Sequence, residues 1–319
     1  VQLQETVPEL CLGKRLDQTL ADMFPDYSRS RLKDWILAGH VSVNGDVTTK
    51  AREKMHGGET ILIEAEIIAE VRFVPQDIPL NIVYEDEDIL VINKPINLVV
   101  HPGAGNPDGT VLNALLHYCP QLELVPRAGI VHRLDKDTTG LMVVAKTIAA
   151  QTHLVEALQA REITREYEAI ANGIMTAGGS VDEPIGRHAT KRTHMAVTFS
   201  GKPALTHYRV FDKFRAHTWL RLRLESGRTH QIRVHMSHIG YPLVGDPLYG
   251  GRPRPPKDAS EELLTFLRGF KRQALHARML SLFHPITGEQ MTWHAETPSD
   301  FNELVRLLKQ DALDHQHDD

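Results

Sequence analysis

The sequence predicts an α+β protein in which a small α+β domain precedes a larger domain built on a mixed, largely antiparallel sheet. Short apolar or alternating runs recur along most of the chain, and helical patterns fall between them without strict alternation. A proline-containing stretch separates two units of different pattern. We therefore expect domains at residues 1–70 and 80–310, a linker at 71–79 and an acidic tail at 311–319.

The N-terminal unit should begin with two helices. Apolar residues recur at helical spacing in residues 15–20 and 31–37. Ser28 or Ser30 is placed to cap the second helix, and Gly39 to end it. Basic side chains on this helix could follow a phosphate backbone: Arg29, Arg31 and Lys33.

A hairpin and a further strand should complete this unit. The alternating run at 41–45 ends in Asn44-Gly45, which is typical of a tight hairpin turn, and residues 59–63 alternate in the same way. A small packing domain with a charged exterior would show the same pattern, so RNA binding is an expectation at this point.

The larger domain should be dominated by short strands. Expected strands cover residues 89–93, 141–145, 167–171, 194–199, 204–211, 218–224 and 277–283. Expected helices cover residues 111–117, 149–160 and 260–270.

Composition places the chain among ordinary globular proteins. Of its 319 residues, 41% are hydrophobic and 24% charged, which excludes a disordered or fibrous chain. Cys11 and Cys119 are too few for a disulfide framework, and no apolar run approaches a membrane span. The first residues also lack a signal-peptide pattern, so we expect a cytoplasmic protein without a membrane partner.

The charge distribution argues against indiscriminate coating of nucleic acid, because the net charge is -5. Positive charge is nevertheless clustered, which indicates either solvated surfaces or one RNA-facing side. The clusters beyond the second helix comprise Arg187, Lys191 and Arg192; Arg221, Arg223, Arg228 and Arg233; and Arg252, Arg254 and Lys257.

One charged, hydroxyl-rich stretch, residues 129–140, opens directly into an apolar run at 141–145. Such a pattern is typical of a catalytic loop delivered to the end of a buried strand, with Asp135 as the reactive candidate. The pattern alone fits a solvated turn equally well.

Four stretches of the chain together resemble the RluA-type pseudouridine synthases. The segment HRLDKDTTG at 132–140 is similar to their catalytic motif. Further matches follow the family order: NKP at 93–95 with VHPG at 100–103, SGRTHQIRVH at 226–235, and RQALHA at 272–277. The N-terminal unit resembles an S4 RNA-binding domain. Asn97 departs from the family, which often has Gly there, but Asn tolerates a left-handed backbone.

The resemblance implies isomerisation of uridine to pseudouridine in structured large-subunit rRNA, with no cofactor and no metal. It places Asp135 as nucleophile at the sugar or as base at C2′, and the residues do not decide between these roles. It also places Arg228 as the ion-pair partner of Asp135 and Tyr167 under the flipped uracil. Arg133 is suited to filling the space that the base vacates. The expected RNA contacts are Arg29, Arg31, Lys33, Arg133, Arg192 and Arg233.

The residues bear on three other functions. A zinc site at His230, His235 or His238 lacks cysteine or acidic ligands to complete a tetrahedral set. A hydrolase using Asp135 and Asp137 is disfavoured, because residues two apart on an extended segment do not flank a substrate. The alternative from another class is a non-catalytic RNA-binding factor in ribosome assembly. For the synthase and for the assembly factor alike, we expect a monomer that binds rRNA within assembling ribosomal subunits.

Overall fold

The structure is a computed structural model that describes residues 1–68 and 73–316 of the chain. The expected domain boundary at residue 70, the first residues of the linker at 71–79 and the last residues of the tail, 317–319, lie outside the described residues. None of the helices in the described ranges is long and apolar enough to cross a lipid bilayer.

The N-terminal domain is a four-stranded antiparallel sheet, ordered β1-β4-β2-β3, with two helices packed against it. Its elements are β1 (Gln2–Thr6), a 3₁₀ turn η1 (Glu9–Cys11), α1 (Leu16–Met23), α2 (Arg29–Leu37), β2 (Val41–Val43), β3 (Asp46–Val47) and β4 (Thr60–Glu64).

The local signals in this domain act as predicted, with one omission. The Ser28 hydroxyl accepts a hydrogen bond from the backbone N–H of Arg31 at 3.2 Å and caps α2. Asn44 and Gly45 both have positive φ, which gives the hairpin between β2 and β3. Strand β1 was not predicted, because its five residues are mostly polar and exposed. It pairs with β4 and lies at the edge of the sheet.

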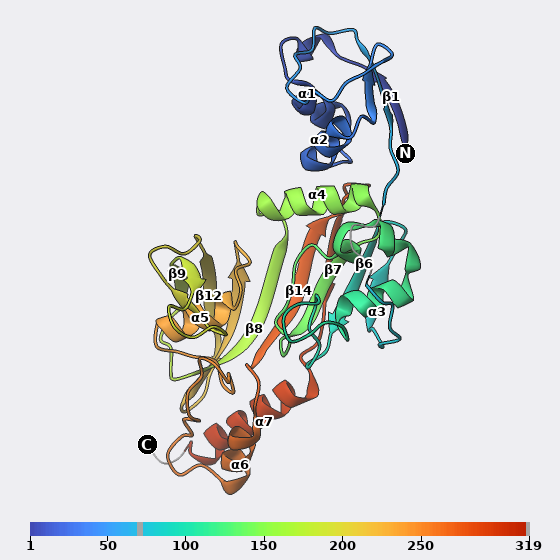
Figure 1. The fold of residues 1–319 in the computed structure, drawn as a ribbon. Helices are drawn as coiled ribbons and strands as arrows, with labels where there is room; N and C mark the ends of the chain where they lie inside the picture. Colours follow the sequence, from blue (N-terminus) through green and yellow to red (C-terminus); the bar gives the residue numbers. More distant parts are fainter. Residues whose placement is uncertain (69–72, 317–319) are drawn as a thin grey trace.

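The C-terminal domain is built on a nine-stranded mixed sheet, which confirms the predicted fold class (Figure 1). Its order is β5-β6-β7-β14-β8-β13-β12-β9, with β15 paired to β14. Strands β7 and β14 run parallel, whereas every other pair described in this sheet is antiparallel. The strands are β5 (Ile82–Glu85), β6 (Ile89–Lys94), β7 (Thr139–Ala145), β8 (Thr164–Asn172), β9 (Gly179–Asp182), β12 (Leu205–Lys213), β13 (His217–Leu224), β14 (Leu275–Phe283) and β15 (Gln290–His294).

Helices and a small hairpin surround this sheet. The helices are α3 (Val111–Tyr118), α4 (Ile148–Gln159), α5 (Gln231–His238), α6 (Glu261–Gly269) and α7 (Ser299–Asp314), with 3₁₀ turns η2 (Pro120–Leu124) and η3 (Pro126–Gly129). The hairpin consists of β10 (Ile185–Arg187) and β11 (Met195–Val197).

The apolar runs of β6 and β7 are continuous because both faces of these strands are buried. Leu90 and Val144 pack in the core that contains α3 and α5. Val91 and Val143 point to the other face, where they pack with α4. Figure 1 shows α4 across one end of the sheet and α6 with α7 at the opposite end. The face that carries α3 and α5 also carries the candidate site.

Two helices of this domain were missed from sequence. Helix α5 mixes histidines and arginines with its apolar residues, so its sequence lacks a clear helical pattern. Helix α7 continues to Asp314, so the predicted acidic tail from residue 311 begins inside it. Asp311 is buried and pairs with Arg215 at 3.0 Å, which fixes the last turn of the helix instead of leaving a frayed end.

Candidate active site

Asp135 lies on the turn that leads into β7. The backbone N–H of Thr138 donates to the carbonyl oxygen of Asp135 at 3.0 Å and closes the turn. Gly140, inside β7, has φ of 122°, and a Cβ there would lie 2.2 Å from the carbonyl oxygen of Ala277 in β14. Only glycine allows this approach between the two parallel strands. The turn is therefore held at the N-terminal end of an interior strand of the sheet.

Lys94 holds the same turn from β6. Its buried ammonium donates to the carbonyl oxygens of Pro95, Leu98 and Lys136 at 2.7, 2.9 and 2.9 Å. Burial lowers the pKa of Lys94 to about 7, but three carbonyl acceptors match the three N–H bonds of its charged form. The predicted NKP motif thus binds the backbone one residue after Asp135.

Two further segments hold the turn. The N–H of Asn97, at a φ of 58°, donates to a carboxylate oxygen of Asp137 at 3.0 Å. The Arg272 guanidinium donates to the Asp137 carbonyl oxygen, and the Gln273 side chain to the Thr138 hydroxyl, both at 3.0 Å. Segments matched separately in the sequence therefore meet around one loop.

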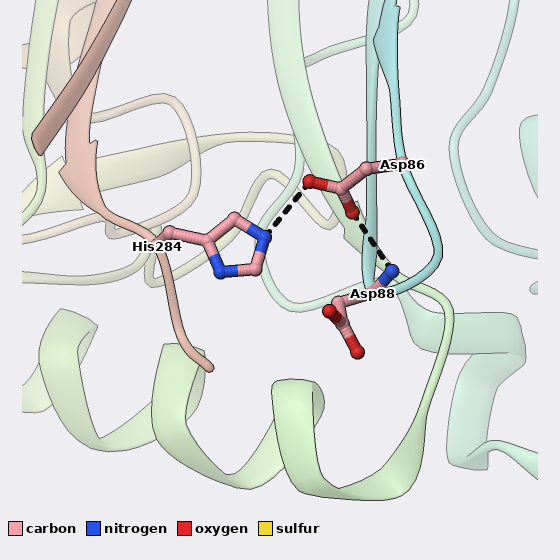
Figure 2. A group of neighbouring side chains, drawn as sticks. All are labelled: Asp86, Asp88 and His284. Atoms are coloured by element: carbon pink, nitrogen blue, oxygen red, sulfur yellow. Dashed lines mark hydrogen bonds and ion pairs between the residues drawn. The ribbon is translucent and has the colours of Figure 1, made fainter. Parts of the chain in front are cut away.

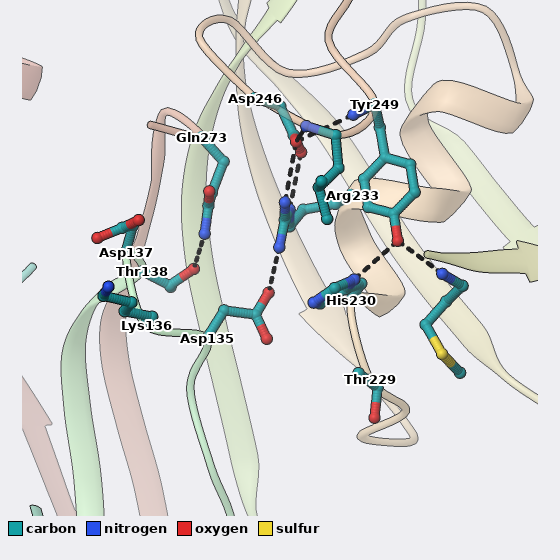
Figure 3. A network of polar contacts seen from close by, with 12 residues as sticks. Asp135, Lys136, Asp137, Thr138, Thr229, His230, Arg233, Asp246, Tyr249 and Gln273 are labelled. Carbon is teal, nitrogen blue, oxygen red and sulfur yellow. Dashed lines mark hydrogen bonds and ion pairs between the residues drawn. The ribbon is translucent and has the colours of Figure 1, made fainter. Parts of the chain in front are cut away.

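Arg233, on α5, forms the ion pair with Asp135 (Figure 3). Its Nη1 lies 3.0 Å from Asp135 Oδ2, while Nε and Nη2 lie 2.7 and 2.9 Å from the two oxygens of Asp246. The Asp246 side chain is 0% exposed, whereas that of Asp135 is 19% exposed. Burial opposes the positive charge of Arg233, but the two carboxylates outweigh it and raise the pKa. Asp135 is thus the one carboxylate of this cluster that remains accessible.

A second layer of contacts fixes Asp246 and reaches back to α5. Asp246 Oδ1 accepts the backbone N–H of Leu248 and of Tyr249 at 2.9 and 3.1 Å. The Tyr249 ring packs 5.1 Å from the Arg233 guanidinium carbon. The Tyr249 hydroxyl lies 2.7 Å from Nδ1 of His230, at the N-terminus of α5. The sequence assigns no role to Asp246 or Tyr249 and considers His230 only as a metal ligand, because nothing in the sequence relates these residues to Asp135.

The predicted pairing of Arg228 with Asp135 is wrong. The Nε of Arg228 donates to the carbonyl oxygen of Pro203 at 2.9 Å, and its backbone N–H to Gln231 Oε1 at 3.0 Å. Arg228 precedes α5, so its side chain follows the loop, while Arg233 lies on the buried face of the helix. Arg233, predicted as a phosphate contact, takes the place expected for Arg228.

Tyr167 lies in the same cavity as Asp135, as the sequence predicts. Strand alternation sends Tyr167 to this face of β8 and its neighbours Glu166 and Glu168 to the other face. The tyrosine is buried, and burial raises the pKa of its hydroxyl, which keeps the group neutral. The Tyr167 side chain therefore lines the cavity beside Asp135.

The small cavity adjoins a cleft of about 690 Å³. Arg133, Arg165 and Arg228 line both. Arg133 is exposed, and its guanidinium donates to the Thr229 hydroxyl at 2.8 Å. Arg165 was not predicted as a site residue, although it stands two positions before Tyr167. The cavity thus opens into a cleft with cationic walls.

The structure does not bring the remaining predicted RNA contacts to this cavity. Arg29, on α2, pairs with Asp17 at 3.1 Å, while Arg31 and Lys33 lie on the same helix. Arg192 is exposed on the loop between β10 and β11. These side chains would contact a ligand only at a distance from Asp135.

One group of side chains elsewhere has metal-ligand chemistry, namely Asp86, Asp88 and His284 (Figure 2). Hydrogen bonds account for it: Nε2 of His284 lies 2.8 Å from Asp86 Oδ2, and Asp86 Oδ1 accepts the N–H of Asp88 at 2.8 Å. Nδ1 of His284 accepts N–H bonds from Ile286 and Thr287. The histidine therefore carries its proton on Nε2 and joins two turns.

His235, one of the candidate zinc ligands, is also engaged in the fold. Nδ1 of His235 lies 2.8 Å from the Thr206 hydroxyl, and its Nε2 lies 2.8 Å from the carbonyl oxygen of Glu183. Both ring nitrogens therefore join α5 to neighbouring strands and loops.

The fold agrees with the comparisons to known proteins. The profile of the RNA pseudouridylate synthase family matches residues 88–238, and that of the S4 domain matches residues 14–61. The chain belongs to the RNA pseudouridylate synthase family and carries an S4 domain at its N-terminal side.

Its similarity to individual members extends over almost the whole chain. Ribosomal large subunit pseudouridine synthase D of Yersinia pestis is 71% identical over 312 residues, covering 98% of this chain and 96% of that protein. The protein of the same name from Pasteurella multocida is 69% identical over 307 residues, covering 96% and 95%. Among solved structures, human RNA pseudouridylate synthase domain containing 4 is 28% identical with a TM-score of 0.55, covering 72% of this chain and 93% of that one.

Proposed function

We propose that this protein is an isomerase that converts uridines of large-subunit rRNA to pseudouridine, with Asp135 as its catalytic carboxylate. The observation that carries the proposal is the ion pair of Asp135 with Arg233, placed in a cavity that also contains Tyr167 and opens into a basic cleft. Membership of the family, and relatives named for large-subunit rRNA, support the reaction and the substrate class.

The reaction breaks the bond between the sugar C1′ and base N1, turns the base, and joins C1′ to C5, which releases the proton of C5. Substrate and product are isomers, and no water attacks the sugar. A second carboxylate, which a glycosidase needs, is therefore unnecessary. Asp135 acts as nucleophile at the sugar or as base at C2′, and it must be ionised for either role. The Arg233 guanidinium favours the ionised form and orients it.

The substrate uridine must leave its stack to reach Asp135, which costs a few kcal/mol and least in a loop or bulge. Contact with the Tyr167 ring offsets about 1–3 kcal/mol of that cost. Arg133, exposed at the mouth of the cavity, is placed to fill the vacated space. Arginines of the cleft are suited to the flanking phosphates.

We further propose how the two domains divide the work and where the protein acts. A domain at residues 1–70 docks on structured RNA through Arg29, Arg31 and Lys33, and a domain at 80–310 performs the reaction, with Arg192 as a further RNA contact. The protein acts as a monomer in the cytoplasm, on rRNA of assembling subunits. Buried, unpaired Cys11 and Cys119 are compatible with a reducing compartment.

Tritium release from rRNA labelled at uracil C5 tests the proposal, with chelator present. We expect release by the parent protein and none by Asp135→Asn, because forming the C1′–C5 bond must expel that hydrogen. Glu166→Gln is the matched control: it alters a buried, arginine-paired carboxylate on the opposite face of β8 and should leave release within about threefold of the parent.

The other outcomes discriminate among alternatives. RNA binding without release from the parent would favour the non-catalytic assembly factor. Equal release from the parent and Asp135→Asn would place the chemistry on another residue.

A further inference from the structure

His230 is held in a strained backbone conformation at the N-terminus of α5. Its φ and ψ are 56° and 23°, in the left-handed region. Such a conformation is unfavourable for a non-glycine residue and persists only where the surroundings fix it. Strain retained beside Asp135 indicates that the direction of this side chain matters.

Hydrogen bonds also determine which nitrogen of His230 carries the proton. The backbone N–H of Met195 donates to the Tyr249 hydroxyl oxygen at 2.8 Å. The hydrogen of that hydroxyl then points to His230 Nδ1, 2.7 Å away, because the reverse arrangement would leave a half-buried O–H without a partner. Nδ1 is therefore an acceptor, and Nε2 carries the N–H of the neutral ring.

The Nε2 side of the ring faces the cavity. His230 lines the same cavity as Asp135 and Tyr167. Figure 3 shows its second ring nitrogen turned from Tyr249 toward Asp135. Within the described part of the chain, this nitrogen makes no hydrogen bond. Burial lowers the pKa of His230 and outweighs the Asp135 carboxylate, which acts in the opposite direction, so the ring is neutral at pH 7.

We propose that His230 is a substrate-positioning residue whose Nε2–H donates a hydrogen bond to a carbonyl oxygen of the flipped uracil. This inference rests on the proposed function and adds a residue to it. Uracil presents two carbonyl acceptors and one N3–H donor, and a ring held in this tautomer can bind only the acceptors. An imidazolium would form an ion pair with Asp135. A neutral imidazole instead keeps its N–H available for the base as the base turns.

Two substitutions of similar polarity separate the pocket donor from the Tyr249 contact. In His230→Gln, the side-chain amide reaches the position of the imidazole Nε2. In His230→Asn, the shorter side chain keeps an acceptor for Tyr249 and tolerates the left-handed backbone, but loses the donor in the cavity. Tyr249→Phe leaves the His230 ring in place but removes the hydroxyl that fixes its tautomer.

The measurements are the single-turnover rate of tritium release from 5-tritiated large-subunit rRNA and the Kd for that RNA. We expect His230→Asn to slow release about tenfold with Kd within about twofold of the parent, and His230→Gln to stay within about threefold. Tyr249→Phe should slow release severalfold, again without a change in Kd. Thermal unfolding midpoints show whether each variant is folded.

Release by His230→Asn at the parent's rate, or equal losses in the Asn and Gln variants, would overturn the inference while leaving the proposed function intact. Tyr249→Phe provides the same test if His230→Asn does not fold: release at the parent's rate would contradict the fixed tautomer. A parent that releases no tritium would overturn the proposed function and this inference together.

Discussion

The two faces of β8 each carry a cluster of arginines and buried carboxylates, and Glu166 in one cluster differs from Asp135 in the other in how many of its oxygens are engaged. On one face, Glu166 uses one oxygen for Arg223 and the other for Arg278. On the opposite face, Arg233 binds only Oδ2 of Asp135, and among the described residues nothing donates to Oδ1. The Asp135 side chain is 19% exposed, whereas that of Glu166 is 4% exposed.

The difference shows that an arginine–carboxylate pair does not by itself mark a reactive site. The free-energy cost of desolvating a buried carboxylate is offset only if its oxygens accept hydrogen bonds or pair with cations. Glu166 meets this requirement through two arginines. Asp135 meets it only in part, because Arg233 is held by Asp246 and contacts one Asp135 oxygen. The unoccupied oxygen is the one that a substrate can approach.

The largest effect that would sharpen this comparison is expected for Asp246→Asn. Without the charge of Asp246, Arg233 loses its support and can shift by an ångström or so, which slows tritium release about 100-fold. The free energy of unfolding should fall by about 3 kcal/mol, because a buried ion pair loses one partner. Single-turnover assays and urea unfolding measure the two quantities.

Glu166→Gln is the matched variant on the other face. Its partners Arg223 and Arg278 are 54% and 23% exposed, so water compensates part of the loss, and the free energy of unfolding should fall by only about 1–2 kcal/mol. A 100-fold loss of activity in this variant would remove the distinction between the two clusters.

An effect of intermediate size is expected for the pH dependence of the free energy of unfolding. His132 and Glu166 should contribute to it over different pH ranges. Burial, followed by the charge of Arg165, lowers the pKa of His132, in the segment that carries Asp135, to about 3. Because the unfolded histidine binds a proton near pH 6.5, its contribution to stability is complete above that pH and is lost as the pH falls toward 3. The slope is at most about 1.4 kcal/mol per pH unit for this group.

The pKa of the Glu166 carboxylate lies below its ordinary value. Burial raises its pKa, but hydrogen bonds from Arg223 and Arg278 outweigh this and hold it below 4.5. Its contribution to stability is therefore present above pH 4.5 and is lost as the pH falls through the pKa of the folded state. Between pH 6.5 and 5, urea unfolding should show a shallower slope for His132→Gln and an unchanged slope for Glu166→Gln. The opposite assignment of slopes would contradict the burial of His132.

The smallest effect is expected for RNA affinity. Raising the salt concentration should weaken binding, because phosphate contacts release counterions. Arg228→Gln, in the cleft, should reduce the slope of log Kd against log salt by about 1, whereas Arg209→Gln, which lines a groove on the opposite face of the sheet, should not change it. Equal slopes for parent and Arg228→Gln would count against RNA binding in the cleft.

The sequence predicted those parts of the fold and of the candidate site that depend on local patterns. The helix cap at Ser28 and the turn at Asn44-Gly45 were predicted correctly, because short-range chemistry decides them. The cavity that joins Asp135 with Tyr167 was anticipated through the family motifs. Strand β1 and helix α5 were missed because their patterns contain too many polar residues for their length.

The partner of Asp135 could not be chosen from sequence. Arg228 and Arg233 belong to one motif, and only the position at which α5 begins, Gln231, determines which of them points inward. The support from Asp246 was equally out of reach, because the loop that carries it has no distinctive pattern and its side chain is oriented by backbone N–H groups. Tertiary contacts, not propensity, decide these details.

The loop around Asp135 is tied by Lys94 from an early strand and by Arg272 and Gln273 from near the end of the domain. A chain emerging from the ribosome makes the first tie long before the last. Between those moments the loop that carries Asp135 lacks its contacts with Arg272 and Gln273. A partly synthesised chain can therefore fold its N-terminal domain before the loop around Asp135 is complete. Because the contacts that hold this loop join residues far apart in the sequence, the proposed activity should begin only after nearly the whole domain has been synthesised.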